Sequence, residues 1–367
     1  WIIDFNPDPT KPAKSILFSR KINAVSHPEI YYNESPIQQT NSHKHLGLIL
    51  DKKLSFTEHL DEKILKAYKG IGILRKLSHF FTRHSLITIY KSFIRPHIDY
   101  CDVIYDKPNN AAFKNKIEKI QYDSALAITG AIRGTSKEKL YKELGLEYLD
   151  KRRWMRRLCL FKKVLRNRFP IYLHNIIPNP IRIYNTRNAN LIPQIPCRSL
   201  MFSSSFFPYT ISEWNKLDES IRKIDSFEIF KNSLLKIIRP TPNNVFLIRD
   251  ATGLKLLTRL RLGLSHLREH KFSHNFQDTV NPLCSCSLEL ENVEHFFLRC
   301  HHFNQSRFNL KNELQLIDPN IIYLPDNELT QVLLFGNSKF SSEINTKILQ
   351  SSIKYIENSK RFEGSLF

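Results

Sequence analysis

Hydrophobic side chains recur every three or four residues along residues 55–169, which is the period of one face of an α-helix. The first stripe spans 60–77 and follows residues 55–58, where Ser-x-x-Glu has the spacing of a capping box at a helix N-terminus. A later stripe ends at Gly130, a residue type that commonly terminates helices. The pattern predicts a bundle of helices over this stretch, one of which stops before Pro96.

The periodicity changes at several points, and these changes divide the chain into segments. Short apolar runs at 15–18 and 45–50 have the length of strands, and six prolines interrupt residues 170–208. The predicted segments are a β-structured remnant at 1–54, a basic helical domain at 55–169, a proline-rich connector with helices at 170–245, a helical Cys/His module at 246–320 and a weakly patterned tail at 321–367. The predicted fold class is mainly α with a small β remnant, a helical bundle joined to a small Cys/His module.

The net charge of the chain is +20, from 55 basic and 35 acidic side chains. Most of the excess lies in residues 51–170, which carry 27 basic and 13 acidic residues. A localised excess of this size is typical of a surface that binds a polyanion, first nucleic acid and second an anionic membrane. No apolar run is long enough to span a membrane, and the first 30 residues do not resemble a secretory signal. We therefore expect an intracellular protein, nuclear or cytoplasmic, that is neither secreted nor membrane-bound.

Basic residues are densest on the helix predicted after Asp150. Arginines four residues apart would form a ridge on one side of this helix, and guanidinium groups bind phosphate oxygens in pairs. The residues predicted to contact a nucleic-acid backbone are Arg152, Arg153, Arg156, Arg157, Lys162 and Lys163. The alternative is a solvated helix face, although such a face usually carries glutamate as well. The nearby Asp99, Asp102 and Asp106 are interpreted as turn and cap residues.

A cluster of thiols and one imidazole follows the leucine-rich helix of the fourth segment. Cys284, Cys286, His295 and Cys300 have the composition of a closed tetrahedral zinc site, so we expect one structural Zn²⁺. Their spacing is not ideal, because Cys-x2-Cys is commoner than Cys-x-Cys, and His301 or His302 could replace one thiolate. The alternative is a trio of reduced, buried cysteines.

Four stretches, taken in order, resemble the downstream part of the reverse transcriptases of non-long-terminal-repeat retrotransposons, of the animal LINE-like type. They are 1–21 for the last palm segment, 43–59 for the primer-grip hairpin, 89–100 (IYKSFIRPHIDY) for the thumb and 284–300 for the C-terminal Cys/His motif. Within the hairpin, His45, Leu46 and Gly47 match a Tyr-Leu-Gly motif, with histidine in place of the usual tyrosine.

The resemblance implies an RNA-directed DNA polymerase whose palm aspartates hold two Mg²⁺ ions. Those aspartates would lie upstream of Trp1, and the chain contains no adjacent Asp-Asp pair. We therefore expect a fragment that keeps only a palm remnant with the primer-grip-like hairpin at 1–54 and lacks the N-terminal palm and fingers segment. It would have no catalytic residues of its own, would make no DNA alone and would require Mg²⁺ only in the full parent enzyme. Its implied partners are the RNA and DNA of a primer–template, held by their backbones. The alternative is a self-standing basic helical module that binds nucleic acid or protein and has no polymerase parent.

Overall fold

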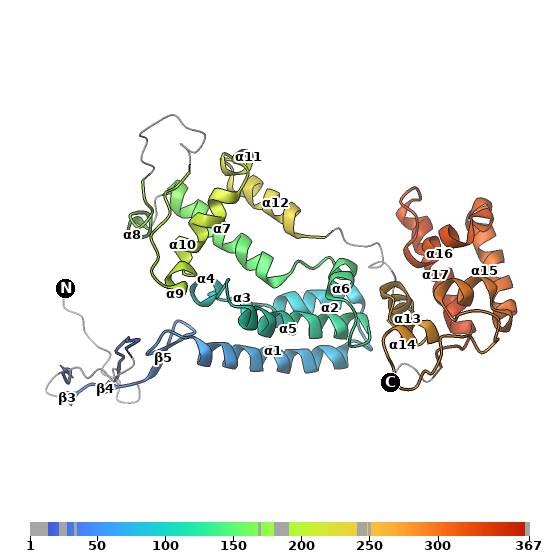
Figure 1. The fold of residues 1–367 in the computed structure, drawn as a ribbon, viewed down its shortest axis with the longest axis horizontal. Helices are drawn as coiled ribbons and strands as arrows, with labels where there is room; N and C mark the ends of the chain where they lie inside the picture. Colours follow the sequence, from blue (N-terminus) through green and yellow to red (C-terminus); the bar gives the residue numbers. More distant parts are fainter. Residues whose placement is uncertain are drawn as a thin grey trace.

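The computed structural model describes residues 14–21, 28–32, 35–167, 170–179, 191–240, 248 and 251–363. Helices dominate this part of the chain, and the strands are short and gather near the N-terminus (Figure 1). The predicted fold class, mainly α with a small β remnant, is confirmed. The first seven residues, which contribute to the palm resemblance, lie outside the described residues.

The strands pair two by two. They are β1 (Lys14–Ser15) with β4 (Gln38–Gln39), β2 (Tyr31–Tyr32) with β3 (Ser35–Pro36), and β5 (Ser42–His45) with β6 (Leu48–Asp51). The β5–β6 pair is an antiparallel hairpin, as the primer-grip resemblance implies. Its two turn residues, Leu46 and Gly47, both have positive φ, 47° and 81°, as a tight type I′ hairpin turn requires.

The helices after the hairpin form the first of three hydrophobic cores. They are α1 (Thr57–Leu77), α2 (Arg83–Ile89), a π-helical turn η1 (Tyr90–Ile94), α3 (Pro96–Asp99), α4 (Asp102–Tyr105), α5 (Ala111–Thr129), α6 (Lys137–Leu144) and the start of α7 (Leu149–Asn167). The long stripes of α1 and α5 pack against each other, with Ile71 and Ile117 buried in the same core. Gly130 ends α5 with φ of 67°, which confirms the predicted C-cap.

The structure differs from one local prediction in this region and confirms another. The capping box does not form: the N-cap of α1 is Phe56, and the Asp51 carboxylate accepts hydrogen bonds from the Ser55 and Phe56 N–H groups instead. The predicted helix end before Pro96 is confirmed, because η1 ends at Ile94 and Pro96 begins a separate helix, α3, where its missing N–H costs nothing. The capping box fails because the Asp51 carboxylate binds the N–H groups in place of the Ser55 side chain.

A second core joins α7 to the helices of the connector. These helices are α8 (Ile171–His174), α9 (Leu200–Ser203), α10 (Phe206–Lys216), α11 (Glu219–Arg222) and α12 (Phe227–Ile238). Phe161 of α7 lies against Trp214 of α10 with ring centroids 5.5 Å apart, and Trp214 in turn lies 5.7 Å from Phe230 of α12. The helix α7 therefore belongs to both cores, so the predicted boundary at residue 169 does not separate two packed units.

A third core lies at the other end of the molecule (Figure 1). It is built by α13 (Ala251–Leu262), the π-helical turn η3 (His295–Arg299), the 3₁₀ turns η4 (His301–Phe303) and η5 (Pro319–Tyr323), α15 (Asn304–Ile317), α16 (Asp326–Phe335) and α17 (Ser342–Asn358). The short α14 (Arg268–Ser273) follows α13 and has no buried residue. Residues 321–367, predicted as a weakly patterned tail, supply α16 and α17, and Leu333 and Ile348 in these helices are fully buried. The third core therefore extends well beyond the predicted module boundary at residue 320.

Buried polar contacts connect the first and third cores through α13. The Arg83 guanidinium of α2 donates to Glu143 of α6 over 2.9 Å and to the Thr258 hydroxyl of α13 over 2.6 Å. Arg261 of α13 approaches the other Glu143 oxygen to 3.1 Å, and Leu262 beside it joins the first core. The third core is thus fastened to the helical bundle by side chains that water does not reach.

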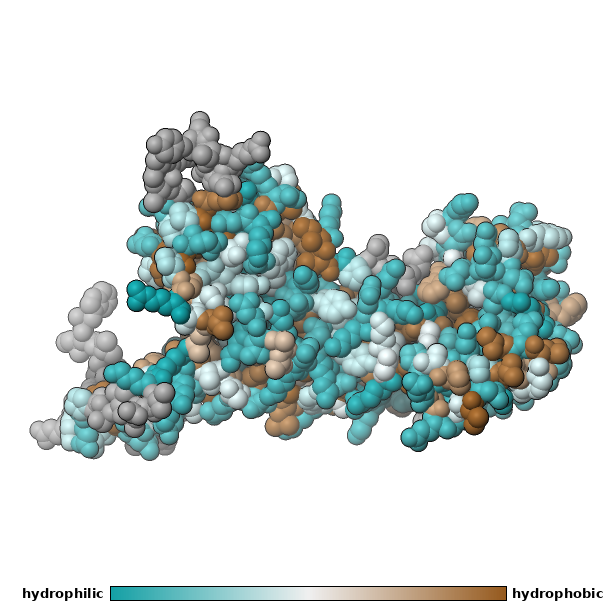
Figure 2. Space-filling view, viewed as in Figure 1, coloured by the Kyte–Doolittle hydropathy of each residue, from teal (hydrophilic) through white to brown (hydrophobic). Residues whose placement is uncertain are grey.

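The surface is mainly hydrophilic on the face that Figure 2 shows, with hydrophobic residues in small separate patches. Among the described helices, none is both long and apolar enough to cross a membrane.

Candidate functional site

The first two members of the Cys/His group lie in a tight loop between two short extended segments. Leu283 bridges Leu290 in antiparallel fashion, and the Cys284 N–H donates to the Glu289 carbonyl over 2.9 Å. Ser287 takes a positive φ of 64°, and its N–H donates to the Cys284 carbonyl. This turn brings both thiols to one side of the loop, which is how the tight Cys-x-Cys spacing closes.

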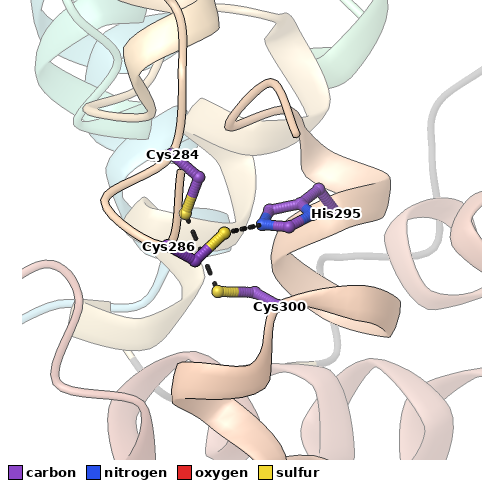
Figure 3. A group of neighbouring side chains, drawn as sticks. All are labelled: Cys284, Cys286, His295 and Cys300. Carbon is purple, nitrogen blue, oxygen red and sulfur yellow. Dashed lines mark hydrogen bonds between the residues drawn. The ribbon is translucent and has the colours of Figure 1, made fainter. Parts of the chain in front are cut away.

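The other two members come from the helical turn η3 and the residue after it. His295 begins the turn, and Cys300 ends it. The Sγ atoms of Cys284 and Cys300 lie 3.7 Å apart, and the Cys286 Sγ lies 3.3 Å from the His295 Nε2 (Figure 3). All four ligand atoms lie within 4.8 Å of one another.

These distances fit a metal ion bound by all four residues. A tetrahedral zinc site with Zn–S bonds of about 2.3 Å has sulfur–sulfur edges of about 3.8 Å and slightly shorter sulfur–nitrogen edges. Cys284, His295 and Cys300 are buried and Cys286 is half-buried, so the group faces the protein rather than open solvent. The Cys3His group can therefore hold a metal ion, and four protein ligands leave no position for a reacting water.

A fifth side chain orients the imidazole. The His295 Nδ1 lies 3.2 Å from the Glu289 carboxylate, on the opposite side of the ring from the thiols. A carboxylate on the outer nitrogen of a ligating histidine fixes its tautomer and raises its basicity. Glu289 was not among the residues that the sequence singled out, because one glutamate between two cysteines and a histidine carries no distinguishing spacing. His301 and His302 are exposed and stay outside the group, so neither replaces a thiolate.

Two of the thiols differ in acidity. Hydrogen bonding from the Leu288 backbone N–H, the largest cause, lowers the pKa of Cys286 to about 7. Burial raises the pKa of Cys300 to about 12, with the neighbouring Cys284 adding to the effect. Because metal binding requires thiolates, a cation at the centre of the group would have to displace the proton of the Cys300 thiol.

The basic helix α7 lies differently from the ridge that the sequence predicts. Arg153 is 3% exposed, Arg157 is 2% exposed and Lys162 is 8% exposed. The Arg153 guanidinium donates to the Ile98 carbonyl over 3.0 Å, and Lys162 donates to the Arg222 carbonyl over 3.0 Å. These three cations are directed into the protein, so they do not form part of a solvent-facing ridge.

Arginines of α7 are bound to carboxylates, most of which come from the segment after Pro96. Arg152 lies 2.9 Å from Asp99 and 2.9 Å from Glu147. Arg156 lies 3.0 Å from Asp102. Asp106 holds Arg157 in the same way, at 3.3 Å. Asp99, Asp102 and Asp106, interpreted from the sequence as turn and cap residues, therefore neutralise the arginines of α7, and only Lys163 among the six predicted residues is exposed.

One of these carboxyl groups has a strongly shifted pKa. Burial raises the pKa of Asp102 to about 6, although the positive charges of Arg156 and Arg153 act in the opposite direction. Its neighbours Asp99 and Asp106 also raise this pKa. The network is a compact structural ion cluster in which desolvation outweighs the attraction of the arginines at this position.

The turn of the β5–β6 hairpin is held against the helical domain. The Tyr100 hydroxyl donates to the Leu46 carbonyl over 2.6 Å, and a Cβ on Gly47 would lie 3.3 Å from the Tyr100 ring. His45 and Leu46 are exposed, and the Leu46 side chain is 79% exposed. Tyr100 belongs to the thumb-like stretch, so the structure joins two of the segments that carry the family resemblance.

Comparison with known proteins gives one distant relative. The chain is 30% identical over 153 residues to the probable RNA-directed DNA polymerase from transposon X-element of Drosophila melanogaster. The alignment covers 40% of this chain and 16% of that protein, so the chain spans a small part of the relative's length. No family model matches the chain, and no solved structure matches it. The similarity supports a relationship to the reverse transcriptases of non-long-terminal-repeat retrotransposons.

Proposed function

We propose that this chain holds a primer–template duplex by its sugar–phosphate backbones, as the thumb-side part of a retrotransposon reverse transcriptase. The similarity to a transposon RNA-directed DNA polymerase supports a reverse-transcriptase-related function. Duplex binding goes beyond this similarity, and one observation supports it. A long basic stretch without acidic residues leaves exposed lysines on one face of α1. The partners proposed here are therefore the RNA and DNA strands of a primer–template.

The internal ion network does not account for the basic excess of residues 51–170. Within these residues, the buried and half-buried ion pairs together use six arginines and five carboxylates. They are Arg83, Arg95, Arg152, Arg153, Arg156 and Arg157, with Asp99, Asp102, Asp106, Glu143 and Glu147. The rest of the segment keeps 21 basic and eight acidic residues. The excess that attracts a polyanion therefore remains, but it lies away from the inner side of α7.

The sequence contains no acidic residue between Glu62 and Asp99, and this interval begins on α1. Lys66, Lys69 and Lys76 are exposed, and their spacing of three and seven residues places them on one face of the helix. Lys66 pairs with Glu62, but an exposed pair of this kind contributes little free energy and exchanges readily for a phosphate. This face of α1, defined by the three lysines, is the proposed phosphate contact.

The test is the salt dependence of duplex binding by the full chain. Each lysine that contacts a phosphate contributes about one to the slope of log affinity against log salt concentration. Changing Lys66, Lys69 and Lys76 to glutamine should lower that slope by about three and weaken all duplex sequences alike. Fluorescence anisotropy with a labelled RNA–DNA hybrid at several salt concentrations measures it.

A matched variant controls for total charge. Lys311, Lys339 and Lys347 are exposed lysines in the part of the chain that builds the third core. Lys347 pairs with Glu343 four residues earlier, as Lys66 pairs with Glu62. Changing these three to glutamine removes the same charge and should leave the slope nearly unchanged. Equal slopes in wild type and in the α1 variant would contradict the proposal.

We also infer that the metal of the Cys3His group is zinc and that its role is structural. Three thiolates and one imidazole at tetrahedral spacing are a donor set typical of structural zinc. The ion would connect the 284–286 loop to the η3 turn, whose Phe296 and Phe297 are fully buried in the third core. Zinc would thereby fix the position of the segment that covers this core.

A further inference from the structure

Three stretches of the chain that lack acidic residues come together where the helical bundle packs against the third core. They are residues 63–98, 124–137 and 251–268. The C-terminal ends of α1 and α5 point toward α13 and α14 (Figure 1). The Arg259 Nε of α13 donates to the Gly130 carbonyl at the end of α5 over 2.8 Å, which joins the second stretch to the third. Positive charge can therefore accumulate at this junction with few carboxylates to neutralise it.

Two arginines supply this charge on the bundle side. Arg75 precedes Lys76, the last lysine of the proposed phosphate contact on α1, and Arg133 lies in the loop after α5. Both guanidinium groups lie near the Tyr68 hydroxyl. Burial, the largest cause, raises the pKa of Tyr68, and the positive charges of Arg133 and Arg75 act against it. Both arginines are exposed, so the basic surface of α1 continues toward the junction.

Two lysines extend the charge across the junction. Lys255 of α13 lies against the end of α5, since a Cβ on Gly130 would be 2.5 Å from the Lys255 Cγ. Lys139 of α6 reaches in the opposite direction, and its Nζ would be 3.3 Å from a Cβ on Gly263, which follows α13. Lys139 is exposed and Lys255 is half-buried. The junction belt is the set of four cations Arg75, Arg133, Lys139 and Lys255.

The belt has little internal neutralisation. Asp123 accepts a hydrogen bond from the Tyr68 hydroxyl over 3.4 Å, and Glu143 binds Arg83 and Arg261. Within the part of the chain that the structure describes, no ion pair or side-chain hydrogen bond connects a belt cation to a partner. Four such cations in a row fit a ligand that carries several negative charges.

The course of the belt favours a single strand over a duplex. The belt leaves α1, crosses the loop after α5 and ends on α13, where Lys255 is half-buried between the two packed units. A duplex resists bending into such a junction. An unpaired strand bends freely and presents successive phosphates to a positively charged groove.

We propose that the junction belt binds the phosphates of an unpaired strand that extends from the duplex on α1 toward the third core. The strand leaves the proposed duplex, so its path rests on the proposed function, but the belt and the α1 lysines are different residues and can be tested apart. The strand is RNA or DNA, because the belt would contact the phosphates that both carry.

The test measures how much an unpaired extension adds to the affinity of the full chain for an RNA–DNA hybrid. Blunt hybrids and hybrids with about ten unpaired nucleotides of RNA or of DNA are compared by fluorescence anisotropy at one salt concentration. Changing Arg75, Arg133 and Lys139 to glutamine alters three exposed positions and leaves the packed residues in place. The glutamine variant of Lys311, Lys339 and Lys347 removes the same charge elsewhere and is the control.

We expect the extension to raise the affinity about tenfold or more in wild type and in the control, and less than about twofold in the belt variant. Blunt-hybrid binding should be similar in all three proteins, which also shows that the belt variant is folded. A gain with only one of the two extensions would identify the strand as RNA or as DNA.

No gain in wild type, or an equal gain in wild type and in the belt variant, would overturn the inference. Failure of the proposed function gives a different result: blunt-hybrid binding would not depend on Lys66, Lys69 and Lys76.

Discussion

The four ligand atoms of the Cys3His group come from 17 consecutive residues, whereas the arginines of α7 find their partners more than 50 residues earlier in the chain. Both regions are dense runs of chemically similar side chains. In the first, a single loop and a helical turn bring the group together. In the second, the packing of α7 on the segment 96–106 decides whether each guanidinium meets solvent or a carboxylate. A local cluster can therefore be interpreted from spacing, and a charged helix cannot.

The two regions should also differ in how strongly one substitution affects the fold. Structural zinc supplies on the order of 10 kcal/mol of apparent folding free energy to small modules. Replacing Cys300 by serine should therefore release the metal and unfold the 284–300 segment, the largest effect expected here. Elemental analysis together with amide hydrogen exchange measures both.

Cys197→Ser is the matched control, because Cys197 is an exposed free cysteine outside the group. It should keep one metal per chain and the same exchange protection. Wild-type protein that is metal-free yet well protected over 284–300 would contradict the metal centre.

Removing a buried cation of α7 should lower the free energy of unfolding less than removing a metal ligand does, but far more than removing an exposed cation does. Arg153→Ala removes the donor to the Ile98 carbonyl and leaves Asp102 and Asp106 with less positive charge nearby. Breaking a buried ion pair on one side costs about 3–5 kcal/mol. Arg166→Ala, an exposed position on the same helix, should change the free energy of unfolding by about 0.5 kcal/mol or less. Urea denaturation of both variants makes the comparison, and equal losses would show that Arg153 is not a buried structural cation.

A smaller effect follows from Asp102. Because its pKa is raised to about 6 in the folded protein, the folded state binds this proton more tightly than the unfolded chain does. The stability that this group contributes is present below about pH 4 and is lost as the pH rises through about 6, by up to about 3 kcal/mol. Asp102→Asn should flatten that part of the stability–pH profile.

Asp61→Asn serves as the control for this profile. Asp61 is an exposed carboxylate that pairs with Lys116 on the surface. Denaturant midpoints measured from pH 4 to pH 7 should follow the wild-type slope in this variant and a shallower slope in Asp102→Asn. If all three profiles run parallel, Asp102 titrates as an ordinary carboxyl group.

The long helices of the bundle were predictable because their apolar stripes are local and complete. The helix α17 was not, since the polar residues Asn345, Ser351 and Ser352 are buried within its stripe. The Ser352 hydroxyl bonds to the Leu333 carbonyl of α16 over 2.9 Å, a partner that no sequence period reveals. Serine hydroxyls that hydrogen-bond to a neighbouring helix can be buried. Their polar side chains interrupt the apolar stripe, so the sequence pattern of such a helix resembles that of a loop.

The candidate sites show the same limit. The four residues of the Cys3His group were predictable as a cluster because they all lie in one short segment, while Glu289 beside His295 has no signature in spacing. For α7, Arg153 and Arg157 count as polar in any pattern analysis. Their burial depends on Asp102 and Asp106, and those partners become visible only after α4 is placed against α7.

The central claim is that the arginines of α7 are internal ion-pair partners and that phosphate contact lies elsewhere. Modification of the native chain with an arginine-specific dicarbonyl reagent, with and without an RNA–DNA hybrid and followed by mass spectrometry, tests it directly. Arg153 should stay unmodified under both conditions, while the exposed Arg75 and Arg166 react in the free protein. Rapid modification of Arg153 in the free chain, with protection by the hybrid, would contradict the claim.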